Sequence, residues 1–363
     1  MPTRDAAAFA VLTLLLLFVA VNLQAGWVYA VDALLVGFAV AGWLSTFLAA
    51  RPLPVYRRMP PEVFEGDRLT VHLSVGPVSP PRFFVRLGDA VPGLDPGEVF
   101  LSLVREQTVV TYETVARRRG VHRVDALDVR SEGITGLFRA RRRLACPGAI
   151  TVLPRYAVLG RFPLPGRRGL ELRPYPQPTR TGTDVAGVRE FRDGDDPTRI
   201  HWRSTARRGH LVVREYEREV EPSAVLLIDT RPDSVDPEGF DDLLRAAASV
   251  AHYVTRRGQP VRILADGVSG PVTVGWMEAL RFLAAVERDG GRTPFEVCAA
   301  LPEGTPVVVF TGEADAVPAL TSRGLPVVAV LAGSAPGGLL LEALGVPVRV
   351  LRRGEEVGAC LDS

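Results

Sequence analysis

Two long apolar stretches open the chain. No charged residue occurs between Ala6 and Val31, and after Asp32 none occurs between Ala33 and Ala50. A helix needs about 20 predominantly apolar residues to cross a bilayer. The pattern therefore predicts a transmembrane helical hairpin over residues 1–50. We place its spans at about 6–21 and 27–48, with a short loop between them.

The charges around these stretches predict how the hairpin is oriented. Arg4 precedes the first span and Arg51, Arg57 and Arg58 follow the second, whereas the loop at 22–26 has no positive charge. Positive residues flanking spans favour the cytoplasmic side. We therefore expect a cell-membrane protein with two spans, both termini and all soluble domains being cytoplasmic. A cleaved signal peptide is the competing interpretation of the first segment.

Asp32 is the one charge inside the predicted second span. A charged residue at mid-bilayer costs about 2.5–3.5 kcal/mol on insertion scales. Asp32 is close enough to the loop for its carboxylate to reach the interface and be solvated. A functional carboxylate within the membrane is the alternative.

Residues 52–155 alternate between apolar and polar positions in several short runs. Arg68–Val75, Arg82–Leu87 and Thr108–Ala116 show the alternation, which is typical of half-buried strands. Val121–Arg130 and Ala149–Leu153 add further strands, and Gly-containing turns separate them. The pattern predicts a small β-sandwich-like domain. We interpret this domain as a spacer or interaction module without chemistry of its own.

Residues 223–363 alternate between apolar strands and amphipathic helices. Ser223–Asp229 is a short apolar run, and Asp236-Pro237 then begins a helix whose apolar positions recur at helical spacing. This alternation predicts a doubly wound α/β domain with a mostly parallel sheet. Ligands of such sheets bind beyond the carboxyl ends of the strands. Asp229 is predicted to stand at such an end.

Residues 156–222 form a linker that contains a dense run of charge. From Arg189 to Glu221 there are eight Arg and eight Asp or Glu. Asp196-Pro197 resembles a helix start and Gly209 a helix stop, so a helix is predicted over Pro197–Arg208. Its spacing would put four residues on one face: Ile200, Arg203, Ser204 and Arg207. A strand is predicted to follow at Leu211–Tyr216.

Three interpretations of this charged segment remain open. The segment can be an internal network of ion pairs that docks one domain onto the next. It can instead bind a partner, because Trp and Arg are the residue types that most often anchor interfaces. A hydrolase using Asp195, Asp196 and His201 as acid and base groups is the third, but no nucleophile elbow, phosphate loop or metal-binding motif accompanies them. We therefore expect a protein that is not an enzyme.

Composition narrows the classes of partner. All 43 basic residues are Arg and 41 residues are acidic, so the net charge of +2 argues against nucleic acid as a partner. The arginine runs at 117–119 and 141–143 fit exposed strands, or contact with anionic lipid. The three cysteines and five histidines are scattered and predict neither disulfides nor a zinc site. No cofactor is expected.

The central motif resembles a known family. The segment GVREFRDGDDPTRIHWRSTARRGHLVVREYE is similar to the signature of the family called domain of unknown function 58. The upstream text ARRRGVHRVDALDVRSEGITGLFRARRR and ITVLPR is similar to the β region of that family. Two N-terminal spans complete the pattern.

The resemblance implies a fold and a set of partners. It implies a von Willebrand factor type A-like C-terminal domain over 223–363. It also implies association with a MoxR-type AAA+ ATPase, with a transglutaminase-like membrane protein nearby. The expected function is thus a membrane-anchored cytoplasmic adaptor or chaperone-like partner of that ATPase. Its interaction residues would be Arg189, Glu190, Phe191, Gly194, Asp195, Asp196, Arg199, His201, Trp202, Arg203 and Arg207.

The chain departs from type A domains at one position that matters. Those domains often hold a divalent cation through a D-x-S-x-S motif after the first strand. Here Asp229 is retained, but Arg231 and Asp233 stand where the two serines would be. An arginine brings a positive charge and no acceptor to the cation position. We therefore expect no divalent cation at the degenerate site Asp229/Asp233, and we expect Arg231 to replace the ion by pairing with Asp229.

Overall fold

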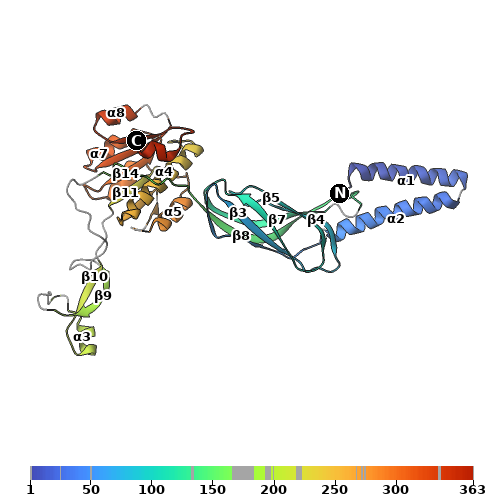
Figure 1. The fold of residues 1–363 in the computed structure, drawn as a ribbon, viewed down its shortest axis with the longest axis horizontal. Helices are drawn as coiled ribbons and strands as arrows, with labels where there is room; N and C mark the ends of the chain where they lie inside the picture. Colours follow the sequence, from blue (N-terminus) through green and yellow to red (C-terminus); the bar gives the residue numbers. More distant parts are fainter. Residues whose placement is uncertain are drawn as a thin grey trace. The chain divides into compact units, whose positions relative to one another are not determined.

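The computed structural model describes residues 2–24, 26–49, 51–131, 135–165, 184–192, 198, 200–217, 223–266, 268–270, 273, 275–333 and 337–362. The chain forms two compact units, Met1–Pro154 and Arg155–Ser363. The first unit contains the two N-terminal helices and a β domain. The second contains an α/β sheet and a small module built around the charged segment (Figure 1).

Two apolar helices begin the first unit, as the hydropathy pattern predicts. They are α1, Arg4–Leu23, and α2, Gly26–Ala49, and both are long and apolar enough to cross a membrane. Thr3 begins α1 by accepting the backbone N–H of Ala6 at 3.2 Å. Both helices extend further toward each other than the predicted spans, which leaves a tighter turn. Gln24 makes this turn with a left-handed backbone, φ 48°.

The two helices pack along a narrow seam. The least exposed positions of α2 recur at alternating steps of four and three residues, at Val28, Asp32, Leu35, Ala39, Gly42 and Thr46. That spacing is typical of helix pairs in a left-handed bundle. Asp32 lies on this seam and is 7% exposed, so it is buried in the hairpin rather than solvated. Among the described residues its Oδ1 has no hydrogen-bond partner.

The β domain consists of two sheets. One has three antiparallel strands in the order β1-β3-β6: Val55–Arg58, Arg68–Val75 and Thr108–Val115. The other has five in the order β2-β8-β7-β4-β5: Glu62–Phe64, Ala140–Leu153, Gly120–Ser131, Arg82–Asp89 and Gly97–Val104. Inward side chains of both sheets share one hydrophobic core, in which Val71, Leu73, Val85 and Leu87 are fully buried. This is the β-sandwich-like arrangement that the alternation predicts.

A buried ion pair crosses this core. The sequence pattern did not predict it. Arg57 of β1 donates to both carboxylate oxygens of Asp89 of β4, at 2.8 and 2.6 Å, and both side chains are fully buried. The Tyr112 hydroxyl of β6 also donates to Asp89, at 2.9 Å. Burial, then the neighbouring carboxylate, raises the pKa of this phenol. The two sheets are thus joined by polar contacts as well as by packing.

The α/β part of the second unit is built on a six-stranded sheet. Its order is β13-β12-β11-β14-β15-β16: Val268–Ser269, Val261–Ala265, Ala224–Ile228, Val307–Thr311, Val327–Ala332 and Val348–Leu351. Only β13 is antiparallel to its neighbour, and the other five strands are parallel. The central strands are buried on both faces, as parallel strands covered by helices must be.

Helices cover both faces of this sheet (Figure 1). The longest, α4 at Pro237–Arg256, packs on β11, β14 and β15 and contacts α5 at Trp276–Ala285 and α9 at Val357–Asp362. The other face contributes its side chains to a core shared with α7 at Ala316–Ser322 and α8 at Gly338–Ala343. The predicted cap of α4 is confirmed, because Asp236 accepts the Gly239 N–H at 2.9 Å. The short helix α6 at Pro294–Val297 was not predicted.

Candidate functional site

The order of the strands places a candidate site at one point of the sheet. The connection from β11 leads through α4 to β12 on one side, and the next strand, β14, lies on the other side of β11. The strand order therefore reverses between β11 and β14. In open α/β sheets ligands bind outside the carboxyl ends of the strands at this reversal.

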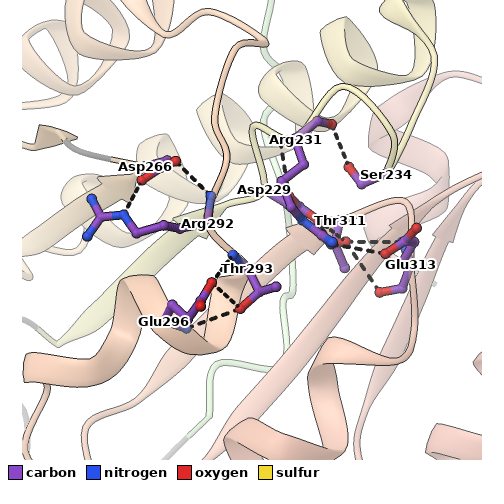
Figure 2. A network of polar contacts seen from close by, with 9 residues as sticks. All are labelled: Asp229, Arg231, Ser234, Asp266, Arg292, Thr293, Glu296, Thr311 and Glu313. Carbon is purple, nitrogen blue, oxygen red and sulfur yellow. Dashed lines mark hydrogen bonds and ion pairs between the residues drawn. The ribbon is translucent and has the colours of Figure 1, made fainter.

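A polar cluster occupies this point (Figure 2). Asp229 follows β11 directly, Thr311 is the last residue of β14, and Glu313 comes two residues later. The Thr311 hydroxyl donates to Asp229 Oδ2 at 2.7 Å. The Glu313 backbone N–H donates to Thr311 Oγ1 at 3.0 Å. We call Asp229, Arg231, Thr311 and Glu313 the switch-point cluster.

Arg231 fills the centre of the switch-point cluster. Its Nε and one terminal nitrogen donate to the two carboxylate oxygens of Asp229, at 3.0 and 2.8 Å, and the same terminal nitrogen donates to Glu313 at 3.0 Å. The Asp229 side chain is fully buried, whereas that of Arg231 is 19% exposed. The hydrogen bond to Asp229 is the main reason why the pKa of Arg231 is raised. The predicted pairing of Arg231 with Asp229 is therefore present.

This arrangement limits what Asp229 can do chemically. Oδ1 accepts the Arg231 N–H at 3.2 Å as well as its Nε, and Oδ2 accepts both Arg231 and Thr311. A carboxylate whose lone pairs are used in this way is a poor general base. Asp233 is exposed in the turn that follows β11. In the described ranges, no group of three or more His, Cys, Asp or Glu side chains could hold a metal ion.

A second polar network lies at the carboxyl end of the neighbouring strand β12 (Figure 2). Asp266 accepts the backbone N–H groups of Gly291 and Arg292, at 2.6 and 2.9 Å, and pairs with the Arg292 guanidinium. The Arg292 N–H is the main reason why the pKa of Asp266 is lowered. Thr293 and Glu296 then form a capping box that begins α6. The loop before α6 is thus held against the switch-point edge.

Sequence reasoning identified Asp229 and Arg231 but missed the other members of these two networks. Thr311 and Glu313 carry a readable signal, because a polar Thr-Gly-Glu step directly follows a buried strand. Asp266 carries the same signal after β12. Their partners in the loop before α6, Gly291 and Arg292, have no local signature.

The charged segment forms a module of its own. β9, Asp184–Glu190, and β10, Val212–Glu217, are antiparallel, and the short helix α3 is Trp202–Arg208. Ile200 makes a bridge with Val213, and both are buried. Backbone bonds from Phe191 to Leu211 and from His201 to Val212, at 2.9 and 2.7 Å, close the module.

The predicted helix Pro197–Arg208 is wrong at Ile200 and His201, and Pro197 and Arg199 lie outside the described residues. The helix begins at Trp202, and its cap is His201, whose Nδ1 accepts the Ser204 N–H at 3.2 Å. Ile200 is therefore not on a helical face with Arg203, Ser204 and Arg207. Its backbone instead pairs with β10, which buries an apolar side chain that a solvent-exposed helix would leave in water. The predicted end is correct, since Gly209 ends the helix with φ 74°.

The proposed interaction residues are described only in part. Trp202, Arg203 and Arg207 are exposed on α3, and Trp202 is 67% exposed. Glu190 lies 3.4 Å from His210, and Phe191, which directly follows β9, donates its backbone N–H to the Leu211 carbonyl. Arg189 belongs to β9, and its side chain is not described. Gly194, Asp195, Asp196 and Arg199 lie outside the described residues.

The hydrolase interpretation is consequently untested. His201 is used as a helix cap, with the Ser204 hydroxyl 2.7 Å from the same ring nitrogen. Its two predicted partners, Asp195 and Asp196, lie outside the described residues.

One comparison with known protein families covers the described part of the charged segment together with Asp229 and Arg231, but ends before Thr311 and Glu313. A family model described as "Protein of unknown function DUF58" matches residues 187–295. The "Uncharacterized protein YeaD" of Bacillus subtilis (strain 168) is 24% identical over 212 residues, which are 54% of this chain and 51% of that protein. This chain thus matches about half the length of that relative.

Two solved structures of the CARDB domain of a Pyrococcus furiosus protein are similar to part of the chain. One was determined by NMR in solution, and the other is a crystal structure in complex with two metal ions. They are 15% and 14% identical and cover 28% and 26% of this chain, and 93% and 86% of those chains. Their TM-scores of 0.19 and 0.17 carry no argument about fold or function.

Proposed function

We propose that this protein is a membrane-anchored cytoplasmic adaptor that binds a MoxR-type AAA+ ATPase through protein–protein contacts. The ATPase is implied by the resemblance of the 187–217 segment to the domain of unknown function 58 family. A transglutaminase-like membrane protein is a further candidate partner. The two apolar helices serve as the anchor. The arginines at residues 4, 51, 57 and 58 favour a cytoplasmic location for everything after Arg51.

The observation that carries this proposal is the exposed Trp202. A tryptophan that is 67% exposed and stands next to Arg203, with Arg207 one turn further on, has the composition of an interface anchor. Large aromatic side chains lose little conformational entropy on binding and bury much area. A short helix that presents such a side chain is suited to a partner protein.

The α/β part contributes a preformed surface in this proposal. We assign it as a von Willebrand factor type A-like domain whose cation is replaced by Arg231. A covalently attached positive charge is present at every magnesium concentration, whereas a bound ion is not. The surface would then be ready for its partner without a metal.

Binding measurements on the full chain test the proposal. The full chain in lipid nanodiscs should bind the purified MoxR-type ATPase of its source genome. Trp202→Ala should weaken the Kd by about 30-fold, since an anchor residue contributes about 2 kcal/mol. Phe295→Ala, which removes another exposed aromatic ring, is the matched control and should bind like the wild type. No recovery of an ATPase, or equal affinity of the Trp202→Ala variant, would refute the adaptor.

A further inference from the structure

One end of the β-sandwich is joined to the membrane helices by several contacts. The Thr3 hydroxyl and backbone N–H both donate to the Leu137 carbonyl, at 2.9 and 3.0 Å, and the Thr46 hydroxyl lies 3.4 Å from the Phe138 carbonyl. A Cβ at Gly42 would overlap the Thr135 side chain. The tip of the β7–β8 hairpin therefore lies beside the last two turns of α2.

This geometry places the tip at the edge of the bilayer. α2 has 24 residues, and at 1.5 Å per residue it is about 36 Å long, slightly more than a hydrocarbon core of about 30 Å. Gly42 is seven residues before the end of α2, which is about 10 Å along the axis. A helix that spans the membrane thus holds the hairpin tip within about 10 Å of the C-terminal end of α2, near the lipid–water boundary.

The start of β4, the end of β5 and the end of β7 also lie at this end of the sandwich. In register, Val85 of β4 is opposite Ser131 of β7, and the Ser131 hydroxyl lies 3.4 Å from the Phe83 carbonyl. Phe83 is paired with Leu103 of β5. Arg82 is buried here, and its own burial and then the nearby Arg51, just after α2, lower its pKa. α2 and β4 are also in contact.

Apolar side chains are exposed at this end. Phe83 and Phe84 are each 38% exposed and Leu103 is 48% exposed. Two consecutive residues of a strand normally point to opposite faces. Here both phenylalanines are exposed, and Phe84, whose ring stacks on that of Phe100 with centroids 6.3 Å apart, has a left-handed backbone with φ 52°. Such a conformation is costly for a bulky residue, which suggests that the outward ring has a use.

Positive charge surrounds these apolar side chains. The exposed arginines of this end come from five different parts of the chain: Arg4, Arg51, Arg105, Arg130, Arg139, Arg141 and Arg142. Asp5 and Glu106 are its exposed acidic residues in the described part of the chain. Exposed apolar side chains flanked by cations suit insertion at the boundary between headgroups and acyl chains, at the anionic surface of a cytoplasmic leaflet.

We infer that this end of the sandwich is a second membrane contact, distinct from the helices. Phe83, Phe84 and Leu103 enter the headgroup region of the cytoplasmic leaflet, and the surrounding arginines bind anionic lipid headgroups. The inference rests on the proposed anchoring of α1 and α2. Its consequence is that the sandwich is held at the membrane surface instead of turning freely on a tether.

Quenching by lipid-attached nitroxides tests the contact in the full chain. A bimane fluorophore on an introduced cysteine at Leu103 should be quenched by headgroup-proximal doxyl lipid in nanodiscs. Quenching should be several-fold stronger in equimolar phosphatidylcholine and phosphatidylglycerol than in phosphatidylcholine alone, and should fall with added salt. The three native cysteines are buried and interfere little with labelling.

Two control positions separate the possible failures. Val121 is exposed at the other end of β7, ten residues from Ser131 and thus about 33 Å away, and its label should not be quenched. Leu14 is exposed in the middle of α1, and its label should be quenched by deep doxyl lipid. An unquenched Leu14 label refutes the anchor itself. A quenched Leu14 label with Leu103 no more quenched than Val121 overturns only the second contact.

A substitution and a change of membrane complete the test. Phe84→Gly removes the ring and suits the left-handed backbone, so the fold should be kept while quenching at Leu103 falls several-fold. Unchanged quenching would overturn the role of this ring. Protection of the Leu103 label in native membranes, without quenching in pure lipid nanodiscs, would show a protein partner at this surface and overturn lipid as its ligand.

Discussion

Single side chains decide whether the switch-point cluster is a metal site. Asp229 is buried at the carboxyl end of β11, and a bidentate ion pair with Arg231 uses both of its carboxylate oxygens. Glu313 shares the same guanidinium. One residue thus supplies the positive charge that Asp229 and Glu313 need, and it does so from within the chain.

At this scale we predict the effect of removing the internal cation. Arg231→Ser leaves the buried Asp229 without its partner, which should lower the free energy of unfolding by about 3 kcal/mol in EDTA. Magnesium should restore part of this loss, because Asp229, Glu313 and Thr311 offer the hard oxygen ligands that it prefers. Denaturant unfolding with and without magnesium measures both effects.

The control is a variant that lacks the carboxylate as well. Asp229→Asn combined with Arg231→Ser should show no response to magnesium. Calorimetric titration with magnesium can contradict the proposed role of Arg231. If the wild type binds magnesium and Asp229→Ala abolishes the binding, then Arg231 does not replace an ion.

At the scale of elements, close packing of loops on strand ends shapes the candidate site. The loop between α5 and α6 passes over β11, where the Gly290 N–H donates to the Thr230 carbonyl at 3.1 Å. Thr230 is buried, and its hydroxyl has no hydrogen-bond partner among the described residues. The approach is so close that a side chain at Gly290 has no room.

We therefore expect alanine substitutions at two adjacent glycines to affect stability differently. A Cβ at Gly290 would overlap the Thr230 hydroxyl and lie 2.9 Å from the Asp266 Cβ, so Gly290→Ala should cost about 1–3 kcal/mol of stability. A Cβ at Gly291 would meet nothing within 4 Å, so Gly291→Ala should change stability by about 0.5 kcal/mol at most. Thermal unfolding of both variants checks the pair. Equal losses would contradict the close approach at Gly290.

At the scale of the whole molecule, the two apolar helices α1 and α2 are the feature that favours a membrane location. α1 and α2 expose apolar side chains along most of their length, which a soluble protein rarely tolerates over such an area. A bilayer removes this cost. The positions of the arginines then favour one of the two possible orientations.

The predicted topology can be read from cysteine labelling of intact cells. A cysteine at Gln24, in the turn between α1 and α2, should react with a membrane-impermeant maleimide added outside. A cysteine at Val121, exposed on the β domain, should react only after the membrane is permeabilised. The reverse pattern would place the soluble units outside the cytoplasm and contradict the proposed contact with an ATPase.

Much of the fold was predictable where local periodicity reports burial. β3 has the predicted bounds Arg68–Val75, and β11, Ala224–Ile228, lies within the predicted run Ser223–Asp229. β5, with two adjacent exposed residues at Ser102 and Leu103, does not alternate regularly and was missed. The start of α3 was misplaced because a local cap signal at Asp196-Pro197 competed with pairing of Ile200 to β10, ten residues or more further along the chain.

In the candidate site, too, some residues could be predicted from local sequence and others could not. Asp229 was predictable, since a polar residue directly after a buried strand faces the edge where ligands bind. The partners Thr311 and Glu313 are about eighty residues away in sequence, and Asp266 finds its partners in a loop about 25 residues further on. No local pattern contains such pairings, because they depend on which strands become neighbours.

The amino-acid sequence by itself determined the apolar hairpin, the alternating strands of the β domain and the strand–helix order of the α/β part. Each of these follows from the hydropathy of a few neighbouring side chains, because the exclusion of apolar side chains from water acts on each segment separately. Only the tertiary structure decided that Arg231 closes on Asp229 and Glu313, that Asp32 is buried between helices, and that Phe84 turns outward beside the end of α2. Those outcomes require distant segments to meet, and packing and charge act only once they are in contact.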